Sequence, residues 1–106
     1  VKHCGCMTHA RRYFVNALPK DKSVQETSAA AEAVRYFEQI YHEENLLSGM
    51  TAEERYKQRQ VKVKPLLDAF FAWLETLQVS GKSALSKAVA YALNEKPYLY
   101  TVKFSR

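Results

Sequence analysis

Two long apolar stripes constrain the fold of this chain more than any other feature of its sequence. Between positions 30 and 47, apolar residues recur at alternating steps of three and four, interrupted only by Glu44. This is the period of one face of an α-helix. A second stripe with the same steps runs from Tyr56 to Leu77 and is polar only at Gln60. The sequence therefore predicts two amphipathic helices, and each needs a partner to cover its apolar face.

The connection between the two stripes is short and contains helix-end signals. Gly49 suits a left-handed helix stop, and Thr51 with Glu54 forms the pattern of a capping box at the next helix start. So short a joint makes the two helices antiparallel neighbours. The sequence predicts an antiparallel helical hairpin, with a kink or break near Lys64 because Pro65 lacks a backbone donor.

The flanking segments predict further helices and a mainly α fold. Thr8 is a candidate N-cap for a helix over 8–18, and Ser83 for a last helix that Pro97 interrupts or restarts. The polar stretch 20–27 predicts a solvated loop. With only three Gly and three Pro, the chain offers few turns for an all-β fold. We expect a single partial domain over 1–106, with a short strand at 1–6, helices over 7–95 and an irregular tail at 96–106.

The charge of the chain indicates polyanionic partners. Sixteen Lys and Arg against eleven Asp and Glu give a net charge of +5, which favours nucleic acid, although a soluble basic domain without such a partner fits equally well. The candidate nucleic-acid-binding residues are Arg11, Arg12, Arg55, Arg59 and Lys62, the last three on one predicted helix face. A solvated helix face is the alternative for that row. No apolar run approaches the roughly 20 residues of a membrane span, so we expect no membrane contact and a cytoplasmic location.

Catalytic and metal-binding patterns are weak. His3, Cys4, Cys6 and His9 offer four ligands within seven residues, but structural zinc sites usually need a second, separated pair of ligands, so we expect no metal site. The carboxylates are Asp21, Asp68 and nine Glu, and none is predicted at a strand end facing another, as two-metal hydrolysis requires. The residues predict no catalytic group and no cofactor in this chain.

The segment Cys6-Met7-Thr8-His9-Ala10-Arg11-Arg12-Tyr13-Phe14 resembles the Cys-Trp-Ala-His-x-Arg-Arg-x-Phe signature of insertion sequence 66 transposases. It departs from that signature at Met7, where the family often has Trp. Two further stretches, 47–55 and 82–94, are similar to the family's hairpin turn and to the segment that leads towards its last catalytic region. The three stretches occur in the family's order and cover nearly the whole chain.

The resemblance implies a fragment of a DNA transposase that uses an Asp-Asp-Glu triad and a divalent metal such as Mg²⁺ on a ribonuclease-H-like sheet. Positions 1–6 would then be a remnant of that sheet, and 12–94 its helical insertion. In the family, the second Asp precedes the Cys-His motif and the Glu follows the final helix, so this chain would have no catalytic residue of its own. DNA is the expected partner through the parent transposase, with a homo-oligomer as a further possibility. The alternatives are a non-catalytic helical interaction module and a small zinc-binding domain.

Overall fold

The predicted hairpin is the centre of the fold. The structure is a computed structural model that describes residues 6–77 and 83–104. Its elements are α1 (Cys6–Asn16), α2 (Lys22–Gln25), α3 (Ala29–Leu46), α4 (Ala52–Gln58), the π-helix η1 (Arg59–Val63), α5 (Lys64–Thr76) and α6 (Ala84–Phe104). The mainly α fold is confirmed, and the described residues include no strand. The strand expected at 1–6 lies outside the described residues except for Cys6, which begins α1.

The two halves of the hairpin begin at side-chain caps. The Ser28 side chain accepts a hydrogen bond from the backbone N–H of Ala31 at the start of α3. At the start of α4, Thr51 and Glu54 exchange the two hydrogen bonds of a capping box, at 3.2 and 3.1 Å. These bonds satisfy donors that the first helical turn leaves free. The predicted restart of the helix at Thr51 is therefore confirmed.

Pro65 changes the helix in front of it. A proline ring in a helix clashes with the carbonyl four residues earlier and removes one hydrogen bond. Here the turn before it widens: Lys64 donates its backbone N–H to the carbonyl of Arg59, five residues back, which is the bond of a π-helix. Pro65 then lies in the first turn of α5, where its missing donor costs little. A kink or break was expected near Lys64; the chain there forms the π-helix η1 and continues without interruption from α4 into α5.

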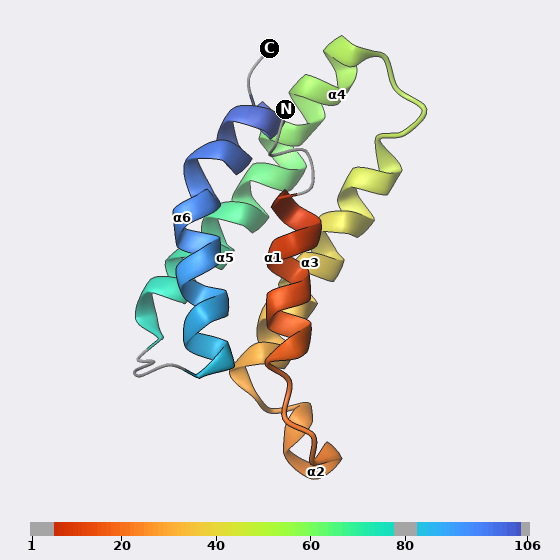
Figure 1. Cartoon of the computed structure of the whole chain (residues 1–106). Helices are drawn as coiled ribbons and strands as arrows, with labels where there is room; N and C mark the ends of the chain where they lie inside the picture. Colours follow the sequence, from red (N-terminus) through yellow and green to blue (C-terminus); the bar gives the residue numbers. More distant parts are fainter. Residues whose placement is uncertain (1–5, 78–82, 105–106) are drawn as a thin grey trace.

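Four long segments run alternately up and down along one another (Figure 1). In that view α1 and the α4–η1–α5 rod point one way along the bundle, and α3 and α6 point the other way. The aromatic centre lies between them: Phe70 of α5 is 5.0 Å from Phe37 of α3 and 6.1 Å from Phe14 of α1, between ring centroids. All three side chains are 1% exposed or less. Burial of these rings against one another stabilises the bundle more than any polar contact described below.

The turn between α3 and α4 differs from the prediction. Gly49 does not adopt a left-handed conformation, and a Cβ added there would meet no atom within 4 Å. The helix ends instead through consecutive short-range turns, in which Leu47 donates to the Glu44 carbonyl and Met50 to the Leu47 carbonyl. Such tight bonds satisfy the last carbonyls without a residue at positive φ.

Two other segments are helical where no helix was expected. Asp21 accepts hydrogen bonds from the backbone N–H and hydroxyl of Ser23 and so caps the one-turn helix α2 inside the predicted loop. The tail was expected to be irregular from 96 onward, but α6 continues past Pro97 to Phe104. Leu99 is 4% exposed, and Tyr100 and Phe104 pack against the same core. Burial of this apolar side outweighs the hydrogen bond lost at Pro97. The N-cap predicted at Thr8 is wrong, because α1 begins at Cys6 and Thr8 lies inside it.

Candidate nucleic-acid interface

The predicted basic row of Arg55, Arg59 and Lys62 is not one free surface. Arg59 binds Glu44 of α3 through two nitrogens, with Nε 3.0 Å and Nη2 2.9 Å from the carboxylate oxygens. The two side chains are 28% and 15% exposed, respectively. Such a bidentate, partly buried pair is the strong form of an ion pair. Arg59 therefore ties η1 to α3, and its charge is already neutralised.

The other two members of the row differ from each other. Arg55 donates from Nη1 to the Met50 carbonyl at 2.8 Å and so fixes the turn before α4. Lys62 is exposed and has no ion pair among the described residues. Sequence spacing placed the three side chains on one face, but Arg59 pairs with a carboxylate and Arg55 binds a backbone carbonyl, whereas no ion pair with a described residue holds Lys62.

The arginines of α1 are also unequal. Arg11 forms an ion pair with Glu38 of α3 at 3.3 Å. Arg12 is exposed and forms no ion pair with any described residue. It lines a hollow of about 290 Å³ together with His9, Tyr13 and Asn16. A second hollow of about 330 Å³ lies between Arg12 and Arg11. Arg12 is thus a free cation beside polar, concave surface.

Tyr13 belongs to this surface, although the sequence argument did not name it as a site residue. Its side chain is 41% exposed, and its ring centroid lies 4.6 Å from that of Tyr91 on α6. The signal was present in the spacing, because positions 9, 12, 13 and 16 form the face opposite to the buried Met7, Ala10 and Phe14. The outer face of α1 therefore combines a cation with an exposed aromatic ring.

A groove between α1 and α3 is the largest of the hollows described here, at about 470 Å³. Arg11 and Glu38 cross it, and Tyr41, His42 and Asn45 of α3 line it with Thr8. The Tyr41 hydroxyl is buried and has no hydrogen-bond partner among the residues that the structure describes. The groove is open and polar, and the Arg11–Glu38 pair occupies its charged centre.

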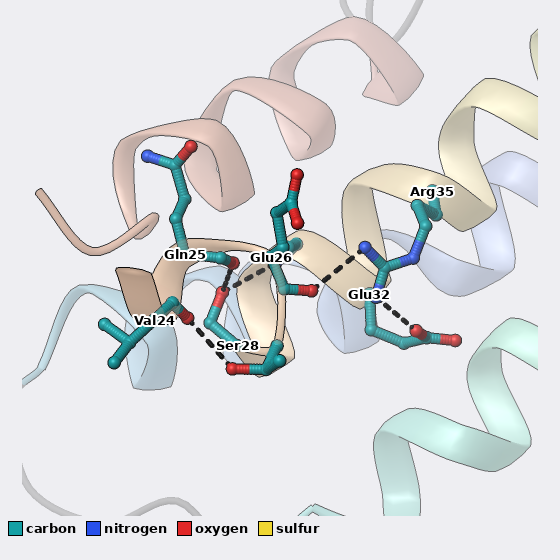
Figure 2. Close-up of polar contacts among 8 residues, drawn as sticks. Val24, Gln25, Glu26, Ser28, Glu32 and Arg35 are labelled. Atoms are coloured by element: carbon teal, nitrogen blue, oxygen red, sulfur yellow. Dashed lines mark hydrogen bonds and ion pairs between the residues drawn. The ribbon is translucent and has the colours of Figure 1, made fainter. Parts of the chain in front are cut away.

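Several carboxylates and backbone carbonyls already accept hydrogen bonds or ion pairs from neighbouring side chains. At the junction of α2 and α3, Arg35 donates to the Glu26 carbonyl at 3.1 Å and to the Glu32 carboxylate at 2.7 Å (Figure 2). Ser28 and Thr27 bond the carbonyls of Gln25 and Val24 beside it. Together these contacts fix the angle at which the chain enters α3. Glu44, Glu53 and Glu54 are engaged in the contacts of the α4 region.

The two Asp side chains are engaged as well. The hydrogen bonds from Ser23 hold the pKa of Asp21 below its usual value. Asp68 of α5 accepts a hydrogen bond from the Tyr100 hydroxyl of α6. Burial, followed by this bond and the Asp68 charge, raises the pKa of Tyr100 well above its usual value. Within 6–77 and 83–104, no three His, Cys, Asp or Glu side chains gather where a metal ion could be held.

The four residues that were weighed as zinc ligands are only partly placed. His3 and Cys4 lie outside the described residues, and for Cys6 only the backbone position at the start of α1 is described. His9 points to the outer hollow of α1 beside Arg12.

None of the described helices is long and apolar enough to cross a membrane.

The described residues thus form a helical bundle whose α1 carries an exposed cation and an exposed aromatic ring on its outer face. The model of the Transposase IS66 family matches residues 1–103, so this chain belongs to the IS66 family of transposases. Two proteins of Sinorhizobium fredii are similar: the uncharacterized protein y4hP, 32% identical over 98 residues, and the uncharacterized protein y4jD, 34% identical over 90. Each match covers 83% of this chain but only 18% and 17% of the relative, so the chain spans less than a fifth of their length. No solved structure matches the chain.

Proposed function

We propose that this chain is the helical insertion of a longer Asp-Asp-Glu transposase and that it contacts DNA without supplying catalytic residues. The observation that carries the proposal is Arg12, an exposed cation with no ion pair among the described residues, beside a hollow on α1. Membership of a transposase family makes DNA the polyanion to consider first. Free Lys and Arg side chains bind phosphates and release counterions, which gives affinity without sequence preference.

The candidate residues then have two different roles in this proposal. Arg12 and Lys62 contact phosphate directly, because each is exposed and free of ion pairs within the described chain. Arg55 and Arg59 hold the α4–η1 segment in place, and Arg11 holds α1 against α3. Their effect on DNA is indirect, since Arg59 and Arg11 pair with carboxylates and the Arg55 side chain is held by a backbone carbonyl.

The proposal that this chain supplies no catalytic residue is supported by the contacts that its carboxylates already make within the fold. Asp21 caps α2, Asp68 binds Tyr100, and Glu44 binds Arg59. A divalent metal such as Mg²⁺ would be bound by other parts of the longer protein. Metal-dependent cleavage of DNA by this chain that disappears in Asp68→Asn would contradict this part of the proposal.

The DNA-binding part is tested by salt-dependent binding to a labelled duplex. For each lost phosphate contact, the slope of log affinity against log salt should fall by about 0.9. We expect this for Arg12→Gln and for Lys62→Gln. Lys57→Gln is the matched control, because it removes the same charge from a side chain that pairs with Glu53. Equal slopes for all three variants and the wild type would remove Arg12 and Lys62 from the interface.

A helical interaction module is the second candidate, and exposed apolar side chains favour it. Val61 in η1 is 65% exposed and Leu46 at the end of α3 is 59% exposed. Single exposed apolar residues are common on monomers, so self-association of the chain is the observation that would support this second function. Sedimentation at several concentrations should show self-association that Val61→Ser with Leu46→Ser weakens; a monomer at all concentrations would exclude a homo-oligomer of this chain.

A further inference from the structure

The outer face of α1 has the composition of a site for a single nucleotide. His9, Arg12, Tyr13 and Asn16 line one hollow of about 290 Å³. This volume is close to the lower limit of roughly 300 Å³ for small-molecule sites. It suits one planar ring system with its phosphate and is too small to receive a duplex. The lining supplies one aromatic ring, one free cation and two side chains that donate and accept hydrogen bonds.

The Tyr13 ring is fixed on one side and open on the other. Tyr91 supports it at 4.6 Å between centroids, with the ring planes tilted by 32°. Tyr91 stands on the part of α6 where Ala88 and Ala92 are fully buried, so its backbone position is set by packing. Tyr13 itself is 41% exposed and lines the hollow. An aromatic ring held in place before binding loses little freedom when a base stacks on it.

The neighbours of Tyr13 suit the other parts of a nucleotide. Arg12 has no carboxylate partner among the described residues, so its guanidinium is available to a phosphate. Asn16 lies one turn further along α1 in the same hollow. Its amide can both donate to and accept from the edge of a base. A base inside a duplex exposes neither its face nor its pairing edge, so this set of groups fits an unstacked base.

We propose that the hollow of His9, Arg12, Tyr13 and Asn16 binds an unstacked nucleotide of single-stranded or frayed DNA, with the base on Tyr13 and a phosphate at Arg12. The inference rests on the proposed DNA-binding function and adds the form of DNA that this site takes. Tyr91 is a positioning residue in this site, because it supports the Tyr13 ring from behind.

The test compares three labelled probes that carry the same sequence: a single strand of about a dozen nucleotides, that strand with abasic sites, and the duplex. The wild-type chain should bind the intact strand about tenfold more tightly than the abasic strand, the effect of roughly one stacked base. Tyr13→Leu should bind both strands equally. Tyr13→Phe should keep the discrimination, since it keeps the ring. Tyr98→Leu is the matched control, because Tyr98 is 46% exposed on α6 and does not line this hollow.

Arg12→Gln provides a second measurement that does not depend on the tyrosine variants. It should weaken binding of intact and abasic strands equally and lower the salt slope for single strands by about 0.7. Equal binding of intact and abasic strands by the wild type, or discrimination that survives Tyr13→Leu, would overturn the inference. If the duplex still binds in that case, the proposed DNA-binding function stands. If none of the three probes binds, both fail.

Discussion

Helix α1 and the α4–η1 segment both carry clustered arginines, but opposite kinds of contact hold them in the molecule. The inner face of α1 is buried through Met7, Ala10 and Phe14, each 8% exposed or less. Helix α4 has no buried residue, and η1 buries only Val63. The segment is also held by the capping box of α4, by the Arg55 bond to Met50 and by the pair of Arg59 in η1 with Glu44. Apolar surface anchors α1, whereas polar bonds supply much of the anchoring of the α4–η1 segment.

This difference decides which cations remain available to a ligand. A helix that is anchored by apolar side chains does not need its arginines for stability, so Arg12 stays free on the outer face. Helix α4 buries no side chain, so α4 and the start of η1 depend more on polar contacts, which Arg55 and Arg59 supply. Counting basic residues along the chain therefore overstates the number of unpaired cations in both segments, since Arg59 in η1 and Arg11 in α1 each pair with a carboxylate of α3.

The largest expected effect tests the apolar anchor of α1. Phe14→Ala removes a fully buried ring that contacts Phe37 and Phe70, and we expect the free energy of unfolding to fall by about 3–5 kcal/mol. Urea unfolding followed by circular dichroism measures the change. Val24→Ala, at an apolar side chain that is 48% exposed, should stay within about 0.5 kcal/mol of the wild type. A loss below about 1 kcal/mol for Phe14→Ala would mean that α1 is not anchored through its inner face.

The second effect compares the two arginines directly. Arg59→Ala removes the bidentate guanidinium contact of the Glu44 carboxylate, which is 15% exposed, and should lower the free energy of unfolding by about 2 kcal/mol. Arg12→Ala should change it by less than about 0.5 kcal/mol. A double-mutant cycle with Glu44→Ala isolates the pair, and we expect the two single losses not to add. If Arg12→Ala were the more destabilising variant, the distinction between the two segments would be lost.

These two arginines also show how far the sequence could predict the site. Local spacing correctly predicted that both lie on helices, because the helical period and caps such as Thr51 and Ser83 depend on nearby residues. It did not predict that Arg59 would be neutralised, since Glu44 is 15 residues away in sequence and meets it only when α3 and η1 pack together. The place of Tyr13 on the outer face of α1 follows from local spacing, but its contact with Tyr91 does not, because Tyr91 comes from the other end of the chain.

The fold shows the same limit at its ends. The hairpin followed from two stripes that each extend over several turns, whereas α2 is a single turn fixed by one Asp21 cap. Pro97 predicted an interruption from local chemistry alone, and the burial of Leu99 against the rest of the core outweighed it. Long periodic segments are therefore predictable, whereas a single turn such as α2 has no periodic stripe to reveal it, and the helix beyond Pro97 depends on tertiary contacts.

A smaller effect tests the turn that introduces α4. Gly49 has open space at its Cβ position and no left-handed backbone, so Gly49→Ala should raise the free energy of unfolding by about 0.4–1 kcal/mol by restricting the unfolded chain. A left-handed helix stop, as the sequence suggested, would instead make this variant destabilising. Ser48→Ala beside it is the control, at an exposed position where we expect a change within about 0.5 kcal/mol. Thermal unfolding of the two variants separates the alternatives.

The smallest effect concerns the end of α6, where apolar and polar anchoring meet. Tyr100 packs against Phe71 at 6.0 Å between centroids, and its hydroxyl donates to Asp68. Its pKa in the folded chain is raised from 10.0 by burial and by Asp68, so above about pH 10 the folded state holds a proton that the unfolded state releases. The stabilisation from Tyr100 is therefore fully present below about pH 10 and is lost as the pH rises further. We expect the stability difference between wild type and Tyr100→Phe to narrow from about pH 9 to about pH 11, because the other tyrosines and lysines affect both proteins alike. A constant difference over that range would show that the pKa of Tyr100 is the same in the folded and the unfolded chain, and so that neither burial nor Asp68 raises it.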